Sequence, residues 1–328
     1  MMKLANGRTL YYGKGDVLCY RTYAAPLEVA SVPESSCTGD GNVIFAHNIK
    51  FAVSGESLLT SFTEGDNSRV VATDSMKNFI LQISAQYEGS TTEGLLAFAA
   101  GKFLEKYEHI TGIELSADRL PFDPVKVGEG ESGVVYRPSR GDYASASLAF
   151  ERTPQGAKLT DMESGVSELH LIKVSGSSFY GFVRDEYTTL PDSYDRPLFI
   201  YLNIHWRYGD AEAGLDGSIG RYVSAAQVRD IATSVFHENN TPSIQYLIYL
   251  IGLRLLERFP QLAEVRFESN NRTWETIVEP AGVGTAGVFT EPRPPYGFQG
   301  FTMTQADLEE EAALRTAAAG AEASGKLG

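Results

Sequence analysis

The order of apolar and polar positions predicts strands and helices in a repeated succession. Alternating or β-branched runs, which are typical of half-buried strands, lie at 43–54, 170–174, 179–188 and 197–208. Helix-like spacing of apolar residues lies at 74–87, 93–108, 224–237 and 242–258. Strands in hairpin order followed by two helices favour an antiparallel sheet with helices on one face. The predicted fold class is therefore α+β.

The chain resembles itself at an offset of 152 residues. FLEKY at 103–107 matches LLERF at 255–259, and both are followed by short strand-like runs. The same offset carries 76–79 onto 228–231 and 92–95 onto 244–247. A period this long is far beyond that of a solenoid repeat. We therefore expect two similar domains, at 8–150 and 151–304.

Two further predictions concern the chain from residue 240 onward. For the helix at 242–258, Asn240 or Thr241 is expected to be the N-cap, with Pro242 in the first turn. Its stretch 246–253 is apolar all round, which indicates cover on both sides by assembly or by a deep core. The acidic, Ala-rich segment 305–328 has no apolar face and is expected to be a flexible tail, as a frayed helix or as disorder.

Charge and hydropathy exclude several classes of protein. The chain has 28 Lys and Arg against 42 Asp and Glu, a formal net charge of −14, which argues against binding to a nucleic-acid backbone. The longest apolar stretch, at 244–253, is too short to span a bilayer, and the first ten residues contain no apolar signal segment. We expect a cytoplasmic protein without membrane contact, in which Cys19 and Cys37 are reduced thiols.

Familiar cofactor motifs are absent or lack their context. The pattern GxGxxG occurs at 128–133 and 282–287, but a strand-like run follows each copy where a dinucleotide site needs a helix. The five histidines are scattered without the spacing of metal ligands. These observations predict neither a nucleotide cofactor nor a metal site.

Four polar stretches with turn glycines or prolines stand out, at 11–17, 67–78, 179–191 and 292–298. Together with Ser243-Ile244-Gln245, they resemble the signature segments of urate oxidases (uricases) of the bacterial type. The resemblance runs from about residue 10 to residue 304.

That resemblance implies a fold, an assembly and a reaction. Uricases are built of two tandem tunnelling-fold (T-fold) domains, and they form homotetramers around a β-barrel tunnel with active sites at subunit interfaces. Their reaction in purine catabolism converts urate, O₂ and water to 5-hydroxyisourate and H₂O₂, with no metal and no organic cofactor. The implied partners are thus urate, O₂ and further copies of the chain.

The resemblance also implies the residues that bind the substrate. Arg196 matches the arginine that clamps urate, and Gln245 matches the glutamine opposite to it. Phe179 matches the aromatic residue that stacks on the purine. Ile244 supplies a backbone contact. Thr73 and Asp74 match the pair that reaches the ligand from a neighbouring subunit.

Three residues match the catalytic group. Lys14 and Thr73 correspond to a proton relay, in which a lysine beside a hydroxyl is the base. Asn271 corresponds to the asparagine that holds O₂ or water above the purine ring. The eukaryotic pattern has a histidine two residues later, where this chain has Thr273. A threonine is not a base near neutral pH, so Thr273 is expected only to support the site indirectly.

Two other functions remain open at this point. One is another T-fold enzyme acting on a pterin or a purine such as GTP; several of these use zinc, for which no His and Cys cluster is evident. The other is a non-catalytic T-fold scaffold that binds purines. The matches at Lys14, Thr73, Arg196 and Gln245 favour urate oxidation over both.

Overall fold

The computed structural model describes residues 3–4, 6–139, 141–272, 274–282, 284–291 and 293–325, with the backbone alone for 318–325. The chain divides into two compact units. Unit 1 comprises Met1–Ser31, Cys37–Gly165 and Asp210–Ala225, and unit 2 comprises Val32–Ser36, Val166–Gly209 and Ala226–Gly328.

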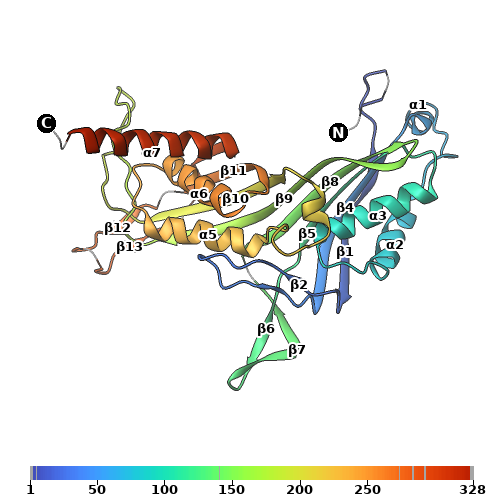
Figure 1. The fold of residues 1–328 in the computed structure, drawn as a ribbon, viewed down its shortest axis with the longest axis horizontal. Coiled ribbons are helices and arrows are strands. Elements are labelled where there is room, and N and C mark those ends of the chain that lie inside the picture. Colours follow the sequence, from blue (N-terminus) through green and yellow to red (C-terminus); the bar gives the residue numbers. More distant parts are fainter. Residues whose placement is uncertain are drawn as a thin grey trace. The chain divides into compact units, whose positions relative to one another are not determined.

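Unit 1 is an antiparallel sheet with two helices. Its strands are β1 (Tyr12–Thr22), β4 (Ile44–Ser54), β5 (Gly112–Arg119) and β8 (Tyr143–Thr153), hydrogen-bonded in that order. The helices α2 (Thr73–Ser84) and α3 (Thr92–Lys106) lie along one face of this sheet (Figure 1). Phe51 of β4 packs edge-on against Phe103 of α3, with ring centroids 4.8 Å apart, so the core lies between sheet and helices.

Unit 2 repeats this order of elements. The long strand β9 (Gly156–Lys173) begins in unit 1 and ends in unit 2, where β10 (Leu198–Tyr208), β11 (Leu262–Arg272) and β14 (Tyr296–Thr304) follow it in the sheet. Between β10 and β11 the chain forms α5 (Ala225–Glu238) and α6 (Ile244–Arg258). Helices α2 and α5 begin 152 residues apart, as do α3 and α6, which agrees with the offset in the sequence.

The alternating pattern at 197–208 forms β10 as predicted. Leu198, Ile200, Leu202, Ile204 and Trp206 are buried, and the residues between them are partly exposed. This is the pattern of a sheet with one face on a core. The strand at 43–54 and all four helices are also confirmed.

Two local predictions are wrong. Residues 179–188 form an irregular loop with an isolated bridge at Phe179 and a turn at 186–187, because Gly181 has a φ of 74° and Asp185 accepts hydrogen bonds from the Tyr187 backbone and the Thr188 hydroxyl. The N-cap of α6 is Ser243, whose hydroxyl accepts from Tyr246 N at 3.2 Å.

Helix α6 is covered by the sheet and by the start of the acidic tail. Gly252 lies so close to β14 that a Cβ there would come 2.2 Å from Met303 Sδ. Residues Gln305–Gly325 form α7, and the Tyr249 hydroxyl of α6 donates to Glu311 of α7 at 2.9 Å. Burial and Glu311 together raise the pKa of Tyr249 to about 12. The flexibility of the tail stays a prediction.

The remaining elements are short. They are β2 (Leu27–Glu28), β3 (Gly39–Asp40), η1 (Glu56–Leu58), α1 (Leu59–Thr63), β6 (Phe122–Val127), β7 (Gly130–Pro138), α4 (Glu212–Leu215), β12 (Thr276–Val278) and β13 (Val288–Phe289). The first GxGxxG pattern spans the turn of the β6–β7 hairpin and the second is followed by β13, so neither precedes a helix, as predicted.

Candidate active site

The predicted relay residues of unit 1 come from a strand and the start of a helix. Lys14 pairs with Phe51 in the β1–β4 ladder, and a bulge follows directly between Lys14 and Val17. Bulges of this kind change the direction in which neighbouring side chains point. Thr73 is the first residue of α2, and Asp74 follows it in the first turn.

A tyrosine fixes the segment before α2 to β1. The Tyr12 hydroxyl accepts a hydrogen bond from Val71 N at 2.8 Å and donates to Val71 O at 3.2 Å. Tyr12 is two residues before Lys14, and Val71 is two residues before Thr73. Both relay residues therefore lie close to one anchoring contact.

Charge at the start of α2 is shared among three residues. Lys77 Nζ donates to Asp74 Oδ1 at 2.7 Å. This bond and the charge of Lys77, followed by the bond from Asn78 Nδ2 and the charge of Lys14, hold the pKa of Asp74 below its usual range. Asp74 is therefore an anion at neutral pH, and it complements the positive end of the α2 dipole.

In unit 2, a looped segment brings Phe179 and Arg196 together. Phe179 and Ser193 exchange two backbone hydrogen bonds, of 2.7 and 2.9 Å, and Arg196 N donates to Ser177 O at 2.9 Å. The Arg196 guanidinium lies 5.3 Å from the centroid of the Phe179 ring. The predicted clamp and the predicted stacking residue are thus neighbours.

The environment of Arg196 leaves hydrogen-bonding capacity unused. Burial lowers the pKa of Arg196 from its ordinary value, but a guanidinium stays charged at neutral pH. Its Nε is buried and has no hydrogen-bond partner among the described residues. A buried donor without an acceptor costs free energy unless a ligand or water supplies one.

A cavity of about 150 Å³ joins Arg196 to Asn271. Both line it, together with Arg272 and Trp274, whose Nε and Nε1 atoms are likewise buried without a partner in the described part of the chain. The described residues that line it are Arg196, Pro197, Leu198, Asn271, Arg272, Trp274, Thr276 and Phe289. A small cavity with several unpaired donors suits a ligand rich in acceptors.

Asn271 is held from two sides. It pairs with Ile200 of β10 and Gly297 of β14, and Gln299 Nε2 donates to its Oδ1 at 3.2 Å. A Cβ at position 297 would lie 2.9 Å from Asn271 Oδ1, so glycine makes room for the amide. Gln299, Arg272 and Trp274 were missed by the sequence reasoning; Arg272 and Trp274 flank Thr273, which lies outside the described residues.

Helix α6 begins with the other two predicted binding residues. Ile244 is buried, whereas Gln245 is exposed at its second position. Ser243 caps one N–H of the first turn, and the others point toward the helix start, where an anion is favoured.

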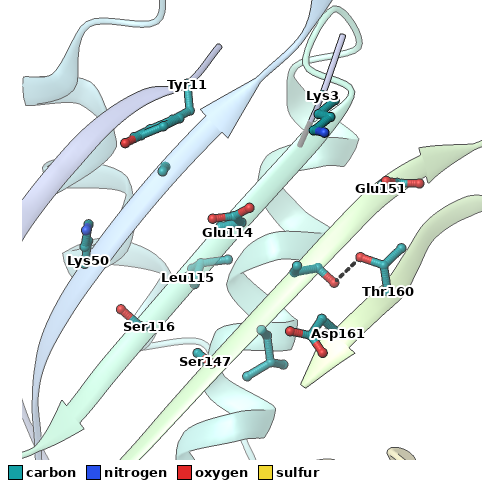
Figure 2. Close-up of a pocket in the computed structure, with 13 residues that line it drawn as sticks. Lys3, Tyr11, Lys50, Glu114, Leu115, Ser116, Ser147, Glu151, Thr160 and Asp161 are labelled. Atoms are coloured by element: carbon teal, nitrogen blue, oxygen red, sulfur yellow. Dashed lines mark hydrogen bonds between the residues drawn. The ribbon is translucent and has the colours of Figure 1, made fainter. Parts of the chain in front are cut away.

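A second pocket lies elsewhere in unit 1. It has a volume of about 680 Å³ and is open along β4, β5, β8 and β9 (Figure 2). Charges of both signs line it, including Lys3, Lys50, Glu114 and Asp161. None of the predicted site residues that the structure describes lines this pocket.

Neither a metal centre nor a membrane span was found in the described part of the chain. Within the described ranges, no three His, Cys, Asp or Glu side chains are grouped so that they could hold a metal ion. No described helix is both long and apolar enough to cross a membrane.

Comparison with known proteins places these residues in a family. The sequence model described as "Uricase" matches residues 43–147 and 162–299. The chain belongs to the uricase family. It is 50% identical to the uricase of Haloferax volcanii over 307 residues, which are 92% of this chain and 99% of that protein.

Other uricase-family relatives extend the comparison. The chain is 54% identical to the uric acid degradation bifunctional protein of Bacillus sp. (strain TB-90) over 93% of its length, but spans only 62% of that relative. A crystal structure of a uricase from Bacillus fastidious superposes with a TM-score of 0.90 at 53% identity, covering 93% of this chain and 97% of the other. The α+β architecture is therefore that of the uricase family.

Proposed function

We propose that this protein is a urate oxidase, which converts urate, O₂ and water to 5-hydroxyisourate and H₂O₂ without a cofactor. The observation that carries the proposal is family membership together with Arg196, which lies against Phe179 and lines a cavity with Asn271. The atoms and electrons balance, since water supplies the hydroxyl oxygen that enters the purine, while urate gives two electrons to O₂, which leaves as H₂O₂.

Substrate binding would use the groups gathered in unit 2. The face of the purine stacks on Phe179, and the Arg196 guanidinium donates to the carbonyl edge of the anion. Gln245 offers a donor and an acceptor to the opposite edge, next to the backbone N–H of Ile244 at the helix start. The donors around Arg196 that have no partner in the described part of the chain support this assignment, since an anionic purine supplies acceptors.

Catalysis would begin with removal of a proton from urate. Lys14, working with the Thr73 hydroxyl, is the proposed base, because urate gives an electron to O₂ more readily after deprotonation. Asn271 would hold O₂ or water above the ring, with its amide oriented by the bond from Gln299. With threonine at 273, water is proposed to complete the relay.

The proposed enzyme is a homotetramer of chains with two T-fold domains, at 8–150 and 151–304. The same succession of two strands, two helices and two strands in both halves supports these domains. In this assembly Thr73 and Asp74 would reach the purine from a neighbouring subunit.

The direct test is turnover without a metal. Protein treated with a chelator is mixed with urate in air, while the loss of near-ultraviolet absorbance and the release of peroxide are followed together. Equal amounts of urate lost and peroxide formed would support the proposal. An intact tetramer that leaves urate unchanged would overturn it.

A further inference from the structure

Two separate segments of unit 2 carry the proposed urate contacts. One is the loop from Ser177 to Arg196, with Phe179 near its start. The other is the beginning of α6, with Gln245 at its second position. If one purine contacts both segments, the distance between the loop and the start of α6 has to be fixed.

One contact joins these two segments. The Ser178 hydroxyl lies 2.7 Å from Asn240 Oδ1 and 2.8 Å from Tyr194 O, so both acceptors are within reach of the same donor. Ser178 directly precedes Phe179 and is buried, with 7% of its surface exposed. Asn240 lies three residues before the Ser243 cap of α6.

The segment that precedes Asn240 is held at the end of α5 by several hydrogen bonds. Lys173 Nζ donates to Phe236 O at 2.8 Å and to Asn239 O at 2.7 Å, which closes the end of α5. Asn239 Nδ2 also donates to Val235 O at 2.8 Å. Because the backbone is held up to residue 239, a movement of Asn240 is transmitted forward, toward Gln245.

We propose that Asn240 is a positioning residue for purine binding, which through Ser178 sets the separation between the Phe179–Arg196 loop and the start of α6. This inference rests on the proposed urate oxidase function. Asn240 itself does not have to touch the substrate. Its loss should weaken the grip on the purine and leave the proton relay of unit 1 unaffected.

The test separates binding from chemistry. Asn240→Ala should raise KM for urate and the dissociation constant of xanthine, measured as a ligand that is not turned over, by about three- to tenfold, the range expected for one hydrogen bond. The value of kcat should stay within about twofold of the parent. Asn240→Ser, which is too short to reach Ser178, should behave in the same way and serves if the alanine variant folds poorly.

A matched control and a double variant make the test specific. Asn239→Ala removes the neighbouring amide, whose bond goes to Val235 O of α5, but leaves the bonds from Lys173 to the backbone at the end of α5 in place, so it should lower the melting temperature without changing KM. Ser178→Ala should raise KM, and adding Asn240→Ala to it should have no further effect, because the shared contact is already lost.

The outcomes distinguish this inference from the proposed function. A parent protein that does not oxidise urate refutes the function. An active parent whose Asn240 variants keep the parental KM, or whose two substitutions act additively, refutes the positioning role alone.

Discussion

Thr91 and Ser243 lie 152 residues apart in the sequence, and each is the N-cap of a helix. The Thr91 hydroxyl accepts from Gly94 N at 3.0 Å and starts α3, and the Ser243 hydroxyl accepts from Tyr246 N at 3.2 Å and starts α6. The second helical residue is Glu93 in one case and Gln245 in the other. Two helix starts that are capped in the same way therefore present two different side chains.

The two side chains have opposite environments. Gln245 is exposed, whereas Glu93 is buried and accepts hydrogen bonds from Ser164 at 2.5 Å and Tyr222 at 3.3 Å. In unit 1 the space that a ligand would need at this helix start is occupied by the protein's own hydroxyl groups. The duplication thus leads us to expect one purine site per chain, in unit 2.

Glu93→Gln should stabilise the protein most at alkaline pH. Burial raises the pKa of Glu93, so its contribution to stability is complete below the pKa of an unfolded glutamate, about 4.3, and is lost as the pH rises through the folded value. The neutral amide does not titrate. Urea unfolding at pH 5 and pH 8, at one protein concentration, should show the advantage of the variant increasing with pH, and a difference independent of pH would contradict a buried titrating carboxyl.

Lys14→Met should lower kcat at least tenfold, which is about 1.4 kcal/mol of barrier. The reason is that the variant keeps the aliphatic length of lysine but loses the proposed base. Lys77→Met is the matched control, since Lys77 also acts on Asp74 but forms an exposed ion pair with little effect on stability. If kcat fell equally in the two variants, the loss would come from a change at Asp74 and not from removal of the proposed base.

The strand predictions at 43–54 and 197–208 are confirmed where the apolar positions of the pattern are buried in the structure. In β10 every second residue is buried, so the sequence pattern and the structure express the same constraint. The segment 179–188 has a similar apolar content, but its large apolar side chains are exposed or contact each other within the loop. Val183 and Tyr187 are 87% and 82% exposed, and Phe182 stacks on Phe179 with ring centroids 4.8 Å apart. Local composition does not distinguish apolar residues of a core from those of an exposed loop.

The error at the start of α6 has a tertiary cause. Asn240 is a good N-cap by type, but its side chain contacts Ser178, 62 residues away. Thr241 donates its hydroxyl to Ser243 O at 2.9 Å, which leaves the cap to Ser243. In the same way, Trp274 could not be recognised as part of a cavity before β10 and β13 had been placed beside it.

Gln245→Ala should weaken urate and xanthine binding together, by about tenfold, with little change in folding stability. The side chain is exposed, and surface substitutions usually change the free energy of unfolding by less than about 0.5 kcal/mol. Xanthine titration and thermal unfolding of the same preparation measure both effects. Unchanged xanthine affinity would exclude Gln245 from the clamp.

Trp274→Phe should raise the dissociation constant of xanthine by about two- to tenfold, because the variant retains an aromatic wall but loses the indole N–H. That N–H is buried beside Arg196 and Asn271 and has no partner among the residues that the structure describes, so a purine with carbonyl groups can accept from it. Trp206→Phe is the control, since Trp206 lies in the core of β10 and lines no part of this cavity.

The same pair of variants provides an optical readout. The chain has two tryptophans, so Trp206→Phe leaves Trp274 as the sole indole emitter. Xanthine should change its fluorescence with a dissociation constant equal to its inhibition constant against urate, since one ligand in the cavity causes both effects. In Trp274→Phe the remaining emission, from Trp206, should stay constant. A signal that follows Trp206 instead, or a Trp274→Phe variant with parental affinity, would show that the purine does not accept from Trp274.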